Sequence, residues 1–138
     1  MQRLTQEILR LCREYGECRV EAERMEEARR VKNALESVCS MARQRLDISD
    51  PALLLALLDA CEVTRDEGML QEVLDVVGRN LDRLAVSAES VKLLACCYYY
   101  VEEKECVERA GRMLEELRKM GRGEEELADV ETILEELT

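Results

Sequence analysis

The seven cysteines are the residues of this chain best suited to chemistry, because a thiolate can act as a nucleophile or bind a soft metal. The sequence contains no histidine, so Ser-His and Cys-His pairs and every His-bearing metal site are excluded. The cysteine count is odd and no pair has CxxC spacing, which argues against a secreted disulfide framework. The cysteines lie at positions 12, 18, 39, 61, 96, 97 and 106.

A four-cysteine zinc site could form from Cys61, Cys96, Cys97 and Cys106 if the predicted helical hairpins bring them together. Adjacent Cys96 and Cys97 would project about 100° apart on a helix, which makes joint ligation of one ion difficult. Most of the cysteines instead fall on apolar stripes, where a free thiol packs as a small hydrophobe. We therefore expect core thiols without a metal or cofactor, in a reducing compartment such as the cytoplasm.

The other chemical groups match no catalytic or ligand motif. Asp and Glu residues are numerous, but their spacing does not match an EF-hand, so a solvated acidic surface is expected instead of a calcium site. The segment Gly121-Arg122-Gly123 lacks the pattern of a phosphate-binding loop and is expected to link two helices. We predict that the protein is not an enzyme.

The net charge of −11 is carried by the C-terminal part of the chain. Residues 1–50 contain ten basic and ten acidic residues, whereas residues 51–138 contain ten basic and twenty-one acidic residues. Because this excess would repel a nucleic acid, we expect no nucleic-acid partner, and a basic partner protein stays open beside a simple solvated surface. No run of 18 apolar residues occurs, so no membrane span is expected.

Composition predicts an all-α protein that forms one domain. A single Pro and six Gly accompany abundant Leu, Glu, Arg and Ala, which are good helix formers. A length of 138 residues is typical of a single domain with its own core. Phe and Trp are absent, although a natural helical domain of this size usually has Phe in its core, and this favours a designed sequence or one drawn from a restricted alphabet.

Apolar spacing and cap residues predict six or seven helices. The first runs over about 3–15, where Gly16 ends it. The second continues without Gly or Pro over 17–46, as one helix of about 45 Å, with a break near residues 29–30 as the alternative. Together they form an N-terminal helical hairpin, residues 1–46.

Two further hairpins are expected over residues 51–121. Asp50 suits an N-cap and Pro51 the first helical position, which predicts a helix at 51–64, followed by one at 67–85. Ser87 is expected to cap a helix at 88–103. Residues 91–101 of that helix are apolar on two faces, so it should lie centrally among the others.

The last two helices are expected at 105–120 and 124–137, the second as a C-terminal cap. Gly111 lies inside the first of them, where Gly costs about 1 kcal/mol relative to Ala. A close approach to the tyrosine-rich helix 88–103 is the expected reason for it. The two central hairpins repeat at about 37 residues, which aligns Leu57 with Leu94, Leu70 with Val107 and Val73 with Ala110.

Residues 52–137 resemble the tetratricopeptide-repeat (TPR) class and, within it, the cytosolic domain of the mitochondrial fission adaptors. The similarity rests on 53–61 followed by 70–77, and on Leu-Ala-Cys-Cys-Tyr-Tyr-Tyr at 94–100 followed by 110–117. The Trp and Phe that are usual in the repeat are missing. The resemblance implies an adaptor that binds a partner helix in a concave groove.

We therefore expect an all-α fold of antiparallel helical hairpins, stacked as a TPR-like repeat or packed as a bundle. The leading functional interpretation is a non-enzymatic helical scaffold of de novo designed origin, without natural activity. The alternative is a TPR-like adaptor that binds a partner helix or peptide through Leu54, Leu58 and Tyr99. An adaptor should leave such side chains open in a groove, whereas a scaffold should bury them.

Overall fold

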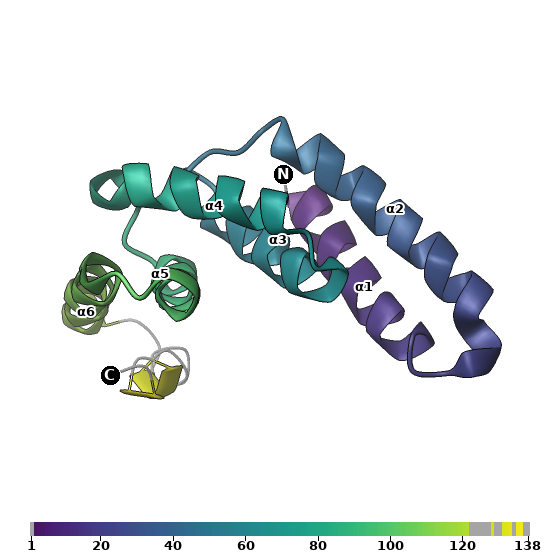
Figure 1. Cartoon of the computed structure of the whole chain (residues 1–138). Coiled ribbons are helices and arrows are strands. Elements are labelled where there is room, and N and C mark those ends of the chain that lie inside the picture. The colour runs from purple at the N-terminus through teal and green to yellow at the C-terminus, as the bar shows by residue number, and fades with distance from the viewer. Residues whose placement is uncertain (1, 122–127, 129–130, 134, 137–138) are drawn as a thin grey trace. The chain divides into compact units, whose positions relative to one another are not determined.

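The computed structural model describes residues 2–121, 128, 131–133 and 135–136 (Figure 1). All regular elements within these residues are helices, which confirms the predicted all-α class. The chain divides into two compact units, Met1–Val73 and Leu74–Thr138. The expectation of a single domain stays a prediction. No helix in the described part is long and apolar enough to cross a membrane.

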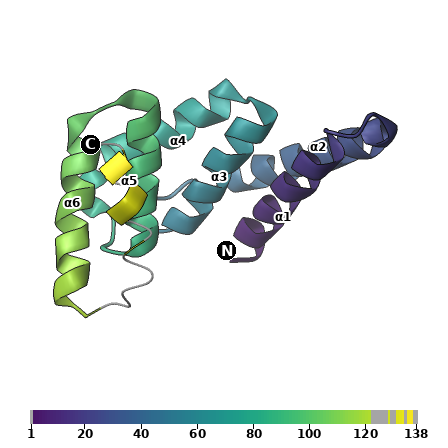
Figure 2. The same cartoon turned by 90° about the horizontal axis from the view of Figure 1, so that it is seen from below.

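Three helices form most of the first unit: α1 (Gln2–Cys18), α2 (Met25–Arg43) and α3 (Pro51–Thr64). α1 packs against both α2 and α3, and it runs antiparallel to α2 (Figures 1 and 2). α3 is apolar around most of its circumference and buries seven of its 14 residues, so it supplies much of the core. The next helix, α4 (Glu67–Arg79), begins in this unit and ends in the second.

The connection between α1 and α2 differs from the predicted one. α1 continues through Gly16 to Cys18, and the chain then turns through Val20 and an extended Glu21 (φ −109°, ψ 117°). A short 3-10 helix, η1 (Ala22–Arg24), leads into α2. The predicted single helix at 17–46 is therefore wrong, and the break lies at residues 19–24 instead of near 29–30.

Burial explains why the chain reverses at this point. Cys18 and Ala28 are buried, but Ala22 and Met25, which continue the same helical spacing, are exposed. Reversal lets α1 and α2 cover each other's apolar faces, which one continuous helix could not do. Gly16 is accepted inside α1 because a helical glycine costs only about 1 kcal/mol.

The predicted start of α3 is confirmed. The carboxylate of Asp50 accepts a hydrogen bond from the Leu53 N–H at 3.2 Å, and Pro51 occupies the first helical position. The helix ends at Thr64, as predicted, because Arg65 adopts a left-handed conformation (φ 59°) and its N–H bonds to the Cys61 carbonyl.

In the second unit, α5 (Ala88–Val101) and α6 (Lys104–Lys119) lie side by side as an antiparallel pair (Figure 2). The hydroxyl of Ser87 accepts a hydrogen bond from the Ser90 N–H at 3.1 Å, which confirms the predicted cap of α5. α4 ends at Arg79 instead of residue 85, because the Asn80 side chain donates to the Val76 carbonyl at 2.7 Å.

A second short 3-10 helix, η2 (Leu81–Arg83), follows α4. The expected reason for Gly111 is wrong, since a methyl group on this residue of α6 would meet no atom of a neighbouring element within 4 Å. The predicted last helix, 124–137, lies mostly outside the described residues, although 128, 131–133 and 135–136 are helical.

Two successive helix pairs, α3 with α4 and α5 with α6, agree in their bounds as well as in their apolar pattern. α5 starts and ends 37 residues after α3, and α6 starts 37 residues after α4. The N-caps Asp50 and Ser87 have the same separation, as do the left-handed residues Arg65 and Glu102. Two of the aligned pairs are fully buried, Leu57 with Leu94 and Val73 with Ala110, whereas Leu70 and Val107 are both half-buried.

Candidate functional site

The three predicted binding residues lie in different surroundings. Leu54 and Leu58 are one turn apart on α3, and both side chains are buried, with 0% and 3% exposure. Tyr99 lies near the end of α5 in the other unit and is 68% exposed. Its ring packs edge-on against Tyr100, with 5.4 Å between the ring centroids. One surface formed by all three residues stays a prediction.

The thiols are core residues, as expected. No disulfide joins the cysteines, all of which lie in the described part of the chain, and every one except the half-buried Cys96 is buried. Burial raises the pKa of Cys12 to about 11, and it raises the pKa of both Cys39 and Cys61 to about 12. These thiols are therefore protonated at neutral pH and are poor nucleophiles. Among the residues that the structure describes, no group of three or more Cys, Asp or Glu side chains could hold a metal ion.

A hollow of about 220 Å³ lies in the first unit between α2, the end of α3 and the start of α4, and we call it the α2 hollow. Arg43 in its wall makes a bidentate ion pair with Glu72, with distances of 2.5 and 2.9 Å, and it lies 3.7 Å from the Asp66 carboxylate. The hydrogen bond from Arg43 lowers the pKa of Glu72. The positive charge of Arg43 in this hollow is therefore balanced by two carboxylates of the same unit.

A larger pocket of about 430 Å³ lies in the second unit between α6 and the segment that joins the end of α4 to η2. Four arginines and three acidic residues are among the residues that line this arginine pocket: Arg79, Arg83, Arg109, Arg112, Asp82, Glu105 and Glu108. The pocket was not expected from the sequence. Its two walls come from segments that lie far apart along the chain and share no motif.

Arg109 connects the two walls of the arginine pocket. Its Nε donates to the Leu81 carbonyl at 3.4 Å, and its Nη2 donates to the Leu84 carbonyl at 3.3 Å. These two bonds engage the carbonyl of the first residue of η2 and that of the residue after its end, and they fix the orientation of the guanidinium plane. Arg109 therefore has a structural role as well as a place in the pocket.

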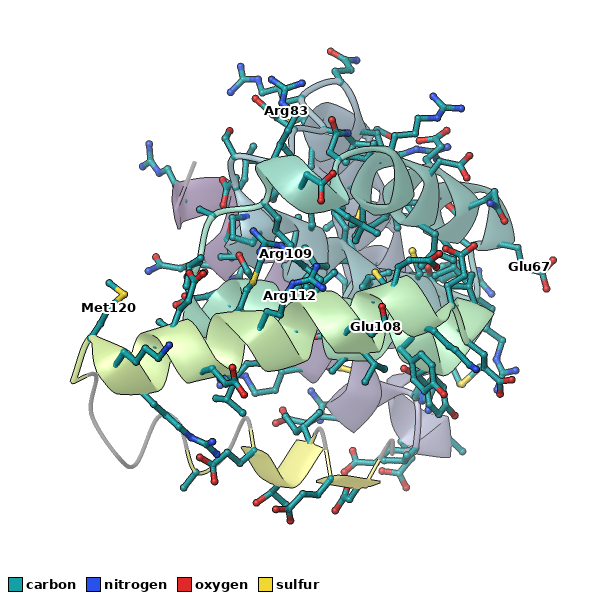
Figure 3. All side chains as sticks on the ribbon, turned by 90° about the vertical axis from the view of Figure 1, so that its left-hand side faces the viewer. Glu67, Arg83, Glu108, Arg109, Arg112 and Met120 are labelled. Carbon is teal, nitrogen blue, oxygen red and sulfur yellow. The ribbon has the colours of Figure 1, made fainter. Side chains whose placement is uncertain are left out.

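The other arginines of the pocket are not neutralised by the protein. Figure 3 shows Arg109 and Arg112 next to each other on α6, on the side toward the segment that carries Arg83. Neither Arg112 nor Arg83 nor Arg79 forms an ion pair with any residue in the described part of the chain. The pocket thus presents unpaired cationic groups on both of its walls.

Comparison of the chain with protein-family models, with curated proteins and with solved structures finds no match.

Proposed function

We propose that this protein is a non-enzymatic helical scaffold of designed origin, built on two 37-residue helical hairpins and without natural activity. The observation that carries the proposal is the burial of Leu54 and Leu58 on α3. An adaptor groove on this helix would need both side chains at its surface, whereas a scaffold uses them as core.

The regularity of the hairpins supports the same proposal. Matching N-caps at Asp50 and Ser87 are devices that idealised helical proteins share. A scaffold needs no reactive group in its core. Protonated, buried thiols fit that description.

A TPR-like adaptor is the second candidate, and the exposure of Tyr99 favours it. A tyrosine that is 68% exposed can supply a large contact area to a partner helix. In that case the partner would bind at the end of α5, and Leu54 and Leu58 would contribute only if α3 became accessible.

Truncation of Leu58 tests whether α3 supplies core, as the scaffold requires, or lines an open groove. If Leu58 is core, Leu58→Ala lowers the free energy of unfolding by about 2–5 kcal/mol. If it lines an open groove, the same change leaves stability close to that of the original protein. Urea unfolding in reducing buffer measures this, with Tyr99→Ala as the control, for which a loss of at most about 1 kcal/mol is expected because only the ring contact with Tyr100 is removed. An unaffected Leu58→Ala variant would refute the scaffold.

The proposed origin has its own test, which is thermal unfolding by circular dichroism in reducing buffer. A melting temperature above about 90 °C is expected of an idealised design, with a thermophilic source as the remaining explanation. A cooperative transition at about 45–65 °C would count against a designed origin and favour a natural adaptor.

A further inference from the structure

We propose that the arginine pocket of the second unit binds the phosphate group of a small molecule. Arg109 and Arg112 on α6 would hold the phosphate from one wall, and Arg79 and Arg83 would hold it from the other. This inference goes beyond a scaffold role, because it assigns a ligand class to a defined site on the chain.

The arginine pocket and the α2 hollow differ in how the charges of their arginines are balanced. In the α2 hollow, Arg43 is engaged by the carboxylates of Glu72 and Asp66. In the arginine pocket, Arg79 and Arg112 have no such partner within the described residues, although carboxylates lie nearby. Neighbouring guanidinium groups repel one another, so an anion between them removes an unfavourable interaction.

The donors of this pocket are partly preorganised. Arg109 uses one N–H of Nε and one of Nη2 on the carbonyls of Leu81 and Leu84, which leaves three of the five guanidinium N–H groups for a ligand. Arg112 lies beside it with its guanidinium unpaired (Figure 3). Because Arg109 is already fixed, less conformational entropy is lost when a ligand binds.

The shape and charge of the pocket select the ligand class. A phosphate presents several oxygens in a tetrahedron, so arginines on two walls can bind it at once, whereas a carboxylate is satisfied by a single guanidinium fork. A volume of about 430 Å³ lies within the range of small-molecule sites and exceeds the size of a bare ion. A polyanion is disfavoured, because the chain has a net charge of −11 and Glu105, Glu108 and Asp82 line the same pocket.

The test is a titration of the ¹⁵N-labelled full chain with inorganic phosphate, followed by NMR. Ionic strength is kept constant with sodium chloride, since any salt screens a strongly acidic protein. We expect saturable shifts of the amides at 78–83 and 105–112, with a Kd below about 1 mM. Arg112→Ala should weaken binding about tenfold or more, because it removes charge-assisted hydrogen bonds without breaking a recorded contact.

The matched control is Arg29→Ala, which removes one exposed, unpaired arginine from α2 in the other unit. It should change the phosphate Kd less than twofold. The proposal is overturned if chloride at equal ionic strength causes the same shifts, or if Arg29→Ala weakens binding as much as Arg112→Ala. Acetate that binds as tightly as phosphate would also overturn it, since the site would then bind any oxyanion.

Discussion

Gly111→Ala should make this protein more stable. Gly111 lies inside α6 with a helical backbone, and a methyl group there meets no neighbouring element within 4 Å. The substitution therefore adds no clash, whereas it restores the helix propensity that glycine lacks and narrows the unfolded ensemble. Together these effects give an expected increase of about 1 kcal/mol in the free energy of unfolding.

The size of the melting-temperature shift depends on how much of the chain unfolds together. With an unfolding entropy of about 2.1 cal/mol/K per residue, 1 kcal/mol raises the melting temperature by about 3 °C if the whole chain unfolds cooperatively. The rise is about 7 °C if the unit Leu74–Thr138 unfolds by itself. Thermal unfolding by circular dichroism, at several concentrations of reductant, measures the shift.

Gly121→Ala provides the opposite control in the same assay. Gly121 has a φ of 71°, a conformation that alanine adopts only with strain, so a loss of about 1 kcal/mol is expected despite the open space around it. If Gly111→Ala lowers the melting temperature instead, a neighbouring element must approach Gly111 closely, and the reasoning from open space is refuted.

Other predictions concern the helix ends, the thiols and one ion pair. Arg65→Gly and Glu102→Gly should each raise the free energy of unfolding by about 1 kcal/mol in urea, because both residues are exposed and have a positive φ that glycine adopts without strain. A decrease would show that the original side chain makes a contact worth more than the backbone strain. Burial raises the pKa of Cys39 and Cys61 to about 12, whereas the same thiols ionise near pH 9 in the unfolded chain. The free energy of unfolding should therefore be at its full value below pH 9 and fall as the pH rises toward 12. Urea midpoints at pH 8 and pH 10.5 check this, with Cys39→Ala expected to reduce the difference, and equal midpoints would contradict it. Arg43→Ala should lower the free energy of unfolding by less than about 1 kcal/mol at low salt and by still less at 1 M NaCl, because its partners Glu72 and Asp66 are substantially exposed. A decrease that salt does not reduce would argue against an electrostatic origin.

Local cap chemistry made the central helices predictable from sequence. Asp50 followed by Pro51 is a strong signal for the first residues of a helix, and Ser87 gives a similar capping signal 37 residues later. Their effects are confined to one helical turn, so neighbouring residues suffice to recognise them. Gly78 and Asn80 give a similar local signal for the end of α4. The prediction placed the end at residue 85 because it followed the apolar pattern, which continues beyond these two residues.

Features that depend on packing could not be predicted in this way. The turn between α1 and α2 contains neither Gly nor Pro, and the apolar spacing continues across it through Ala22 and Met25. Only the mutual burial of two helices makes reversal favourable, and that is a tertiary effect. The arginine pocket is similar, because Arg83 and Arg109 become neighbours only when η2 lies against α6.

The buried thiols also determine how this protein is irreversibly oxidised during storage. While the chain is folded, water and oxidants reach few sulfur atoms, but each global unfolding event exposes all of them together. In air, unfolded molecules would then cross-link through mixed pairings that the native fold cannot accommodate. The practical lifetime in an oxidising solution is therefore a rate, governed by how often the chain opens, and an equilibrium stability measured in reductant does not determine it.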